Sequence, residues 1–256
     1  MKSLIRKLFY SKIAVDIRNN LNFRSTAWNV NNLSNISISD GFLWRTDNNF
    51  ETKFKYTDIL NFFFNIQDSW VEIHFYSKDN KLIKVENKNT LKISNELIIN
   101  SNYLNGIEDY GTFYIYHFSN KKFNDQTIIA NRCYSGYAQN LVLPSVVHGN
   151  VFARYKNFTN QGKTNTGIIN TTLFSNSTYK IQKYFNNFDK SELFFNNPTK
   201  KNIKFYLNDK RYDLEFGNSI LVDISSKKTI TIVSNCKLLR PLIFSYKDKF
   251  LDVHHA

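Results

Sequence analysis

Residues 127–150, TIIANRCYSGYAQNLVLPSVVHGN, and residues 231–255, TIVSNCKLLRPLIFSYKDKFLDVHH, carry the pattern on which the fold prediction rests. Both stretches begin with a β-branched run, place an Asn close to a Cys, and reach a Val-His near their end. Short β-branched and aromatic runs between turn residues are typical of strands. Their likeness predicts that the chain repeats a β unit.

Further matches accompany these two stretches in the same chain order. They pair residues 63–65 with 194–196, 73–76 with 203–206, 78–80 with 208–210, 95–100 with 218–223, 127–129 with 231–233, and 147–148 with 253–254. One match means little in a chain with 23 Phe and abundant Asn, Lys and Ile. The shared order of six favours a duplication.

Single segments also predict local structure. Residues 70–76 alternate apolar and polar side chains, as a half-buried strand does. Residues 78–81 suit a hairpin turn, because Asp and Asn tolerate a left-handed backbone. The apolar run 59–64 fits either a strand or a short helix capped from residues 56–58. Residues 113–118 are nearly all apolar or aromatic, which predicts a strand covered on both faces.

Short strands, hairpin turns and little helical periodicity predict an all-β protein of two tandem sandwich-like or jelly-roll-like repeats. One pseudo-twofold sandwich is the alternative. Residues 1–20 are expected to form a basic amphipathic helix that packs on its own domain, with an anionic membrane as the alternative. The first repeat is then 21–155, a polar linker 156–178, and the second repeat 179–256.

The net charge of +13 over 256 residues bounds the partners. A basic chain suits nucleic acid, an anionic membrane or an acidic glycan, whereas a solvated Lys surface needs no partner at all. Nucleic acid is not favoured, because no basic run and no recognition motif is present. No apolar stretch is long enough to span a bilayer. The start of the chain does not fit a signal peptide, because Arg6, Lys7 and Lys12 interrupt its apolar run. We expect a soluble, cytoplasmic protein, with Cys133 and Cys236 as its two thiols or as one disulfide.

The candidate ligand contacts are Arg side chains close to aromatic ones. A planar guanidinium binds carboxylate or phosphate, and aromatic rings stack on sugar faces. A structural Arg–Asp pair at the Arg45-Thr46-Asp47 corner, or an Arg bound to backbone carbonyls, is the alternative. The predicted set is Trp44, Arg45, Arg132, Tyr134 and Arg240.

Three histidines form the candidate metal set. His148, His254 and His255 follow the matched strands, so a pseudo-twofold would bring their imidazoles together. Neutral imidazoles suit zinc, or iron with a carboxylate such as Asp252. The spacing matches no metal motif, and structural or surface histidines with no cofactor are favoured. Cys133 with His148 as nucleophile and base is less favoured than a buried thiol.

The phrases FLWRTDN, NRCYSGY and LRPLIF-x-Y resemble uncharacterised proteins encoded among surface-polysaccharide genes. This resemblance reaches no family of established activity and assigns no residue. We expect a non-catalytic protein that binds an acidic glycan or glycoconjugate. A self-associating structural subunit such as a coat protein, forming a homo-oligomer, ranks second, and a His-ligated metal-dependent enzyme of sugar or small-molecule metabolism third.

Overall fold

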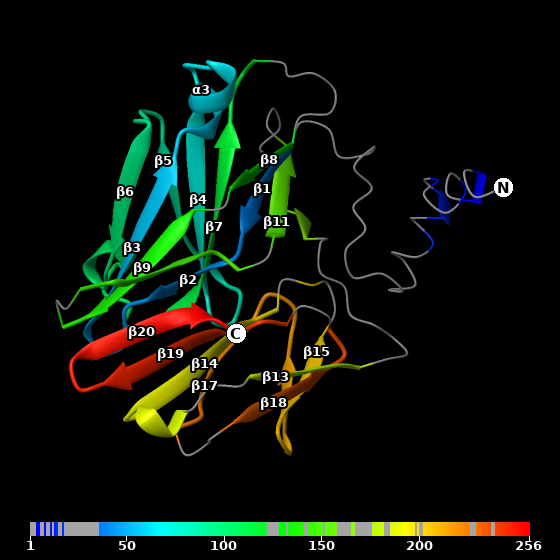
Figure 1. Cartoon of the computed structure of the whole chain (residues 1–256). Helices are drawn as coiled ribbons and strands as arrows, with labels where there is room; N and C mark the ends of the chain where they lie inside the picture. The colour runs from blue at the N-terminus through cyan, green and yellow to red at the C-terminus, as the bar shows by residue number, and fades with distance from the viewer. Residues whose placement is uncertain are drawn as a thin grey trace.

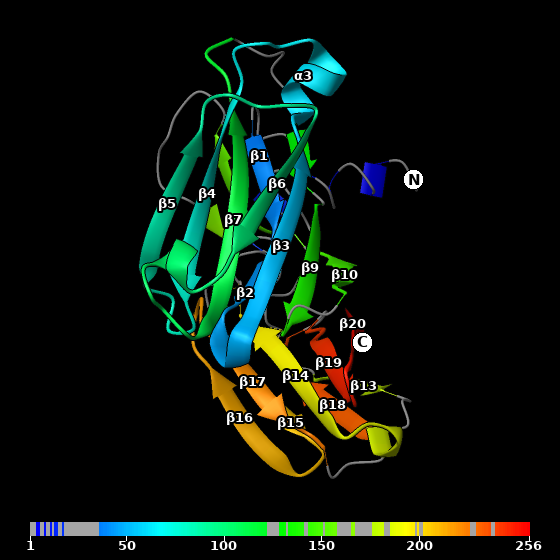
Figure 2. The same ribbon diagram turned by 90° about the vertical axis from the view of Figure 1, so that its left-hand side faces the viewer.

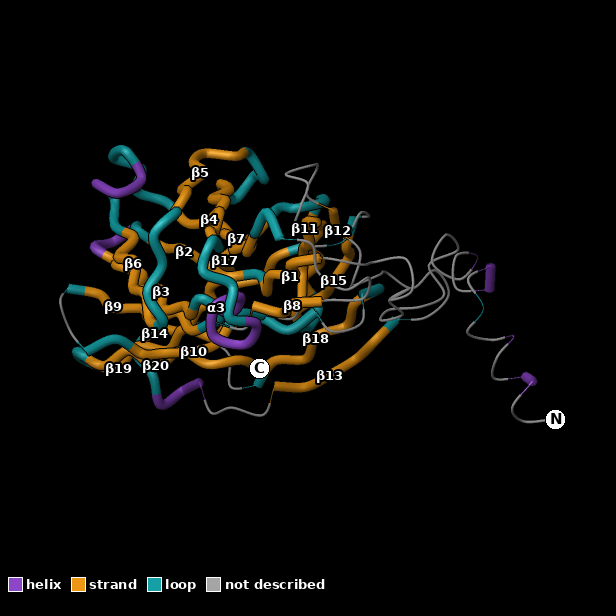
Figure 3. The backbone as a smooth tube through the Cα atoms, turned by 90° about the horizontal axis from the view of Figure 1, so that it is seen from above, coloured by secondary structure: helices purple, strands orange, loops and turns teal. Residues whose placement is uncertain are grey.

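The computed structural model describes residues 36–121, 128–131, 133–140, 143–150, 152–157, 165–166, 176–181, 185–197, 199, 202–225, 229–236 and 239–256, with seven positions before residue 18. Strands make up most of this part of the chain (Figure 3), so the all-β prediction is confirmed. The helix predicted over residues 1–20 lies largely outside the described residues.

The described strands form sheets of four, and neighbouring strands are antiparallel except for β1 and β8. What we call the N-terminal half holds three sheets. The first consists, in order, of β12 (Asn165–Thr166), β11 (Phe152–Asn157), β1 (Ile36–Asp40) and β8 (Ile128–Asn131). The second consists of β2 (Phe42–Arg45), β7 (Tyr110–Phe118), β4 (Trp70–Ser77) and β5 (Leu82–Lys88), and the third of β10 (Ser145–His148), β9 (Tyr134–Gln139), β3 (Phe50–Thr57) and β6 (Ser94–Ile99). The C-terminal half holds two: β13 (Ser177–Ile181), β18 (Ile230–Ser234), β15 (Ile203–Leu207) and β16 (Lys210–Leu214); β17 (Ser219–Asp223), β14 (Lys190–Asn196), β19 (Leu242–Lys247) and β20 (Phe250–His255). Figure 1 shows the two halves stacked end to end.

Short helical elements connect some of these strands. They are η2 (Asp47–Asn49), α3 (Ile59–Phe64), η3 (Asn102–Leu104) and η4 (Phe185–Asn187). The run 59–64 is therefore the capped helix rather than the strand of the two sequence alternatives. Asp58 decides this, because its side chain accepts the Asn61 backbone N–H and caps the first turn.

An aromatic core fills the space between the β2-β7-β4-β5 and β10-β9-β3-β6 sheets. The alternation read from residues 70–76 is confirmed on this side, since Val71, Ile73 and Phe75 are completely buried. They pack with Phe54 and Ile99 from the facing sheet. Burial of this many large apolar side chains is the main stabilisation of the half.

The opposite face of β4 is also covered, although its polar residues predicted a solvent-exposed face. Glu72 and His74 are buried beneath β11, whose Lys156 Nζ donates to Glu72 Oε2 at 2.9 Å. Strand β7 continues past the end of its pairing with β2. There the backbone N–H groups of Ile115 and His117 donate to the hydroxyl groups of Ser39 and Ser37 on β1. Hydrogen bonds and an ion pair thus hold this second layer, which permits its polar sequence.

The C-terminal half has its own core, and a third cluster joins the two halves. Leu193, Phe195, Phe205 and Ile232 belong to the core between the two C-terminal sheets. The joining cluster contains Leu43, Phe50, Tyr137 and Val147 from the N-terminal half, and Phe194, Leu242, Phe244 and Val253 from the other. Continuous apolar packing across the boundary makes the relative position of the halves part of the fold.

The predicted repeat is matched only in places. Residues 78–80 and 208–210 both form turns between paired strands, β4–β5 and β15–β16, with Asn80 and Asn208 at φ 59° and 51°. Residues 63–65 end helix α3, however, whereas residues 194–196 end strand β14. Likewise β8 is parallel to β1, whereas β18 runs antiparallel to both neighbours. The predicted correspondence was therefore wrong for these two pairs of segments, 63–65 with 194–196 and 127–129 with 231–233. Similar apolar runs take different partners in the two halves.

The structure also bears on the predictions for the two cysteines, the linker and a membrane-spanning segment. Cys133 and Cys236 are free thiols, buried in separate cores, and do not pair. Residues 156–178, predicted as a linker, include the end of β11, strand β12 and the start of β13. Among the described helices, none has the length and apolar character needed to cross a membrane.

Candidate functional site

Trp44 and Arg45 are placed inside the protein. The Trp44 indole is completely buried, and its Nε1 donates to the Tyr76 carbonyl oxygen at 2.8 Å. The Arg45 side chain is 1 % exposed, with its guanidinium carbon 4.2 Å from the centre of the Phe50 ring. Neither side chain presents a surface to a ligand, so their predicted role as contacts is corrected to a structural one.

Arg45 is the centre of a buried ionic cluster between the two halves. Its Nε donates to Asp47 Oδ1 at 2.7 Å, and its Nη1 donates to Glu192 Oε2 at 2.8 Å. The Tyr246 hydroxyl accepts from Arg45 Nη1 at 2.9 Å and donates to Glu192 Oε2 at 2.7 Å. The Arg–Asp pair anticipated at this corner therefore exists and continues into β14 and β19 of the C-terminal half.

This cluster makes stability depend on pH. Burial alone would raise the pKa of Glu192, but the charge and hydrogen bond of Arg45, with hydrogen bonds from Lys190 and Tyr246, lower it to about 2. A carboxyl whose pKa is lower in the folded than in the unfolded state stabilises the protein above its unfolded pKa. We expect this contribution, about 3 kcal/mol in the free energy of unfolding, to disappear as the pH falls from about 4.5 to about 2. Urea unfolding across that range checks it, and Glu192→Gln is expected to remove that part of the pH dependence.

The structure brings together two of the three candidate metal ligands. The rings of His148 and His255 lie 4.6 Å apart between their centres, and His255 Nε2 lies 2.9 Å from the His148 carbonyl oxygen. Burial, and the nearby charge of Arg240, lower the pKa of His255 to about 4. His254 directly precedes His255 within β20, so its side chain faces the other side of the strand, where Nδ1 contacts Asp252 at 3.1 Å. Within the described residues no three His, Cys, Asp or Glu side chains are grouped to hold a metal ion.

The thiol alternative is not supported by the environment of Cys133. Burial raises the pKa of this thiol far above its usual range. The nucleophile in thiol chemistry is the thiolate, which needs a lowered pKa. Cys133 therefore packs as a small apolar side chain in the aromatic core.

Two of the remaining predicted contacts, Tyr134 and Arg240, lie near the histidine pair. Tyr134 is exposed at the start of β9, opposite His148 of β10. Arg240 Nε donates to the Ala256 carbonyl oxygen at 2.9 Å. Arg132 lies outside the described residues. The four predicted contacts that the structure describes are thus divided between a buried corner and this surface, and they do not form one site.

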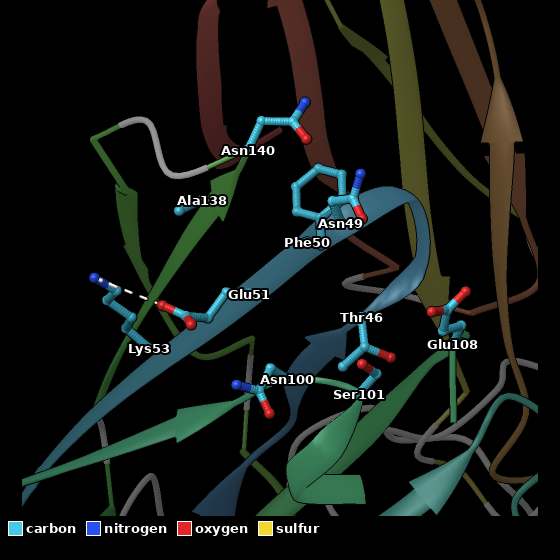
Figure 4. A pocket seen from close by; sticks show the side chains of 10 residues that line it. All are labelled: Thr46, Asn49, Phe50, Glu51, Lys53, Asn100, Ser101, Glu108, Ala138 and Asn140. Atoms are coloured by element: carbon cyan, nitrogen blue, oxygen red, sulfur yellow. Dashed lines mark ion pairs between the residues drawn. The ribbon is translucent and has the colours of Figure 1, made fainter. Parts of the chain in front are cut away.

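A cleft that the sequence did not predict lies next to the buried corner (Figure 4). Its volume is about 550 Å³, within the range of small-molecule sites. It opens where β3 begins and where β6 and β9 end, because those strands are antiparallel neighbours in one sheet. We call this the polar cleft; it is lined by Thr46, Asn49, Phe50, Glu51, Lys53, Asn100, Ser101, Glu108, Ala138 and Asn140.

Turns in which one residue adopts the left-handed conformation shape the backbone around the polar cleft. Asn49 and Asn140 have φ of 60° and 52°, a region in which Asn is among the best-tolerated residues after Gly. The Asn140 N–H donates to the Asn49 carbonyl oxygen at 3.4 Å, and Gln139 Nε2 donates to the Asn48 carbonyl oxygen at 3.0 Å. The two Asn side chains are therefore carried by turns that are tied to each other.

Several polar groups of the cleft have no protein partner among the described residues. These are the side chains of Asn49, Ser101, Glu108 and Asn140. Glu51 contacts Lys53 at 3.6 Å, and the Asn100 side chain accepts the Tyr103 N–H. Phe50 forms the apolar part of the wall, and Arg45 packs against its ring. The cleft therefore offers amide, hydroxyl and carboxylate groups beside one aromatic ring.

Comparison with known proteins adds no family. The sequence matches no model of a known protein family, and it matches no curated protein. The function therefore has to be argued from the site itself.

Proposed function

We propose that the polar cleft binds a glycan or glycoconjugate without catalysing a reaction on it. The observation that carries the proposal is the ring of unpartnered amide, hydroxyl and carboxylate groups on a fixed backbone. Sugars present adjacent hydroxyl groups, each a donor and an acceptor, and amides and carboxylates satisfy both roles. Because the turns are already formed in the free protein, little backbone ordering would oppose binding.

The charges in the cleft indicate which groups of a glycan would make the main contacts. The acidic glycan was inferred from the net charge of +13. The cleft itself contains the carboxylates of Glu51 and Glu108 and the ammonium group of Lys53. We therefore propose that sugar hydroxyl groups make the main contacts, and that an acidic group on the ligand would pair with Lys53 or lie outside the cleft. Matched neutral and acidic oligosaccharides separate these contributions.

The two predicted sandwich-like repeats remain part of the proposal. Support comes from the C-terminal half, where two four-stranded sheets face one another across a shared apolar core. In the N-terminal half a third sheet is added on the polar side of β4 and β7. The polar cleft lies at the end of the β10-β9-β3-β6 sheet where β3 begins. Phe50 belongs both to the wall of the cleft and to the joining cluster.

Removing the two turn amides is expected to weaken binding. We predict that Asn49→Gly with Asn140→Gly lowers the affinity for a bound oligosaccharide by at least about tenfold, because each amide contributes hydrogen bonds of about 1 kcal/mol. Glycine keeps the left-handed backbone, so the change is confined to the side chains. Calorimetric titration of a panel of neutral and acidic oligosaccharides is the measurement.

Asn105→Gly is the matched control. Asn105 is also exposed and left-handed, at φ 58°, but it does not line the cleft. Equal affinity of both variants and the wild type would contradict the proposed site. Failure of every oligosaccharide to bind would contradict glycan recognition, and release of reducing ends from a bound one would contradict its non-catalytic character.

A further inference from the structure

Helix α3 presents three consecutive aromatic side chains to solvent. Phe62, Phe63 and Phe64 are 59, 68 and 46 % exposed. The helix stands at the end of the N-terminal half that is remote from the C-terminal half (Figure 1), close to where β5 ends and β6 begins (Figure 2). Leaving three large apolar side chains in water is unfavourable, so such a patch points to an interaction.

The structure holds these rings outward on a firmly attached helix. Asp58 is buried and accepts from the Asn61 N–H and from the Ser69 hydroxyl. Leu60 and Ile66 form a small buried cluster beneath the helix. Asn65 ends the helix in a left-handed conformation, and its N–H donates to the carbonyl oxygen of Asn61. Both ends are capped and one face is buried, so the exposure of the opposite face belongs to the folded state.

Basic side chains and a further apolar one lie on segments at the same end of the N-terminal half as the helix (Figure 2). Ile93, 63 % exposed, lies in the loop between β5 and β6 with Lys92, and Lys121 follows β7. None of the described carboxylates forms an ion pair with Lys92 or Lys121, whereas the nearby Asp68 accepts a hydrogen bond from Ser119. We call the side chains of Phe62, Phe63, Phe64, Ile93, Lys92 and Lys121 the aromatic tip.

The size and shape of the aromatic tip decide between its possible occupants. The exposed part of the three Phe rings amounts to roughly 350 Å², at about 200 Å² for a whole side chain. A standard protein interface buries about 800 Å² on each partner, so a second copy of the chain would find too little apolar surface. A short projecting helix with flanking ammonium groups instead matches a lipid interface, where rings enter the acyl boundary and Lys contacts anionic headgroups.

We propose that the aromatic tip inserts into the interface of an anionic lipid bilayer. The positive net charge of the whole chain attracts such a surface, and the Phe rings supply the apolar contact. The proposal is independent of the polar cleft, which lies at the opposite end of β3.

Vesicle binding of the full chain tests the proposal. We expect the wild type to bind phosphatidylcholine vesicles that contain phosphatidylserine more tightly than vesicles of phosphatidylcholine alone. Phe62→Ser with Phe63→Ser is expected to lower the partition coefficient at least about tenfold. The control is Phe250→Ser, because Phe250 is 78 % exposed on β20, in the other half. All these proteins keep residues 1–20, so a contribution of that basic segment is common to them.

A depth measurement shows which part of the protein enters the bilayer. The additional fluorescence of Phe63→Trp should be quenched by brominated lipids, and that of Phe250→Trp should not. Equal vesicle binding of the wild type and the double Ser variant, or equal quenching of the two Trp variants, would overturn the proposal. A dimer in sedimentation that the double Ser variant dissociates would overturn it in favour of a second copy.

Discussion

Replacing Arg45 with Met is expected to lower the free energy of unfolding by about 3–5 kcal/mol. The guanidinium is almost completely buried and holds Asp47, Glu192 and Tyr246 in one cluster. Without it, the Glu192 carboxylate stays mostly buried and keeps Lys190 and Tyr246 as partners. The Lys190 side chain is 45 % exposed and compensates the buried charge only in part, so the loss of Arg45 costs more than the ion pair itself contributes.

Urea unfolding of the variant measures this change. Arg211→Met is the control, because Arg211 forms an ion pair with Asp213 in which both side chains are 51 % exposed. Exposed pairs contribute about 1 kcal/mol at most. Combining Arg45→Met with Glu192→Gln should recover part of the loss, since the second change removes the charge left without its main partner. A loss below about 1 kcal/mol for Arg45→Met would contradict the structural role assigned to Arg45.

Gly111→Ala is expected to destabilise the protein by about 3 kcal/mol or more. Gly111 lies on β7 opposite Trp44 of β2. A Cβ atom there would overlap the Tyr76 carbonyl oxygen and approach the Trp44 Nε1 atom to 2.8 Å. The added methyl group therefore collides with both members of the Trp44–Tyr76 hydrogen bond, and one of them is backbone.

Thermal unfolding checks this result. For a chain of this size 3 kcal/mol corresponds to a decrease in Tm of about 6–12 °C. Gly106→Ala separates crowding from backbone conformation, because no atom lies within 4 Å of its added Cβ although its φ is +83°. That variant should lose only about 1–2 kcal/mol. Equal losses in the two variants would show that close approach at Gly111 is not what requires glycine.

The sequence pattern predicted the class and several elements of the fold but not its layers. Alternation at 70–76 identifies the buried face of β4, with Val71, Ile73 and Phe75 completely buried. It does not reveal that Glu72 and His74 are buried as well, because the cover comes from Lys156, far along the chain. Periodicity describes one strand, whereas layer order depends on partners that only the folded chain brings together.

The candidate site was predicted less well, for a similar reason. The corner from Trp44 to Asp47 concentrates an indole, a guanidinium and a carboxylate, which is typical of a binding site. Those groups satisfy one another and the Glu192 carboxylate, so their chemistry is directed inward. The polar cleft is assembled from the separated stretches 46–53, 100–108 and 138–140. In a chain rich in Asn, the amides at 49 and 140 give no local signal.

The most direct test of glycan binding at the polar cleft locates the ligand. The protein labelled with ¹⁵N would be titrated with the oligosaccharide that binds most tightly in the calorimetric panel. Binding at the cleft should shift the backbone amide resonances of Asn49, Glu51, Ser101 and Asn140, and the shifts should vanish in Asn49→Gly with Asn140→Gly. Shifts confined to other surfaces, such as that of Tyr134 and His148, would contradict the account.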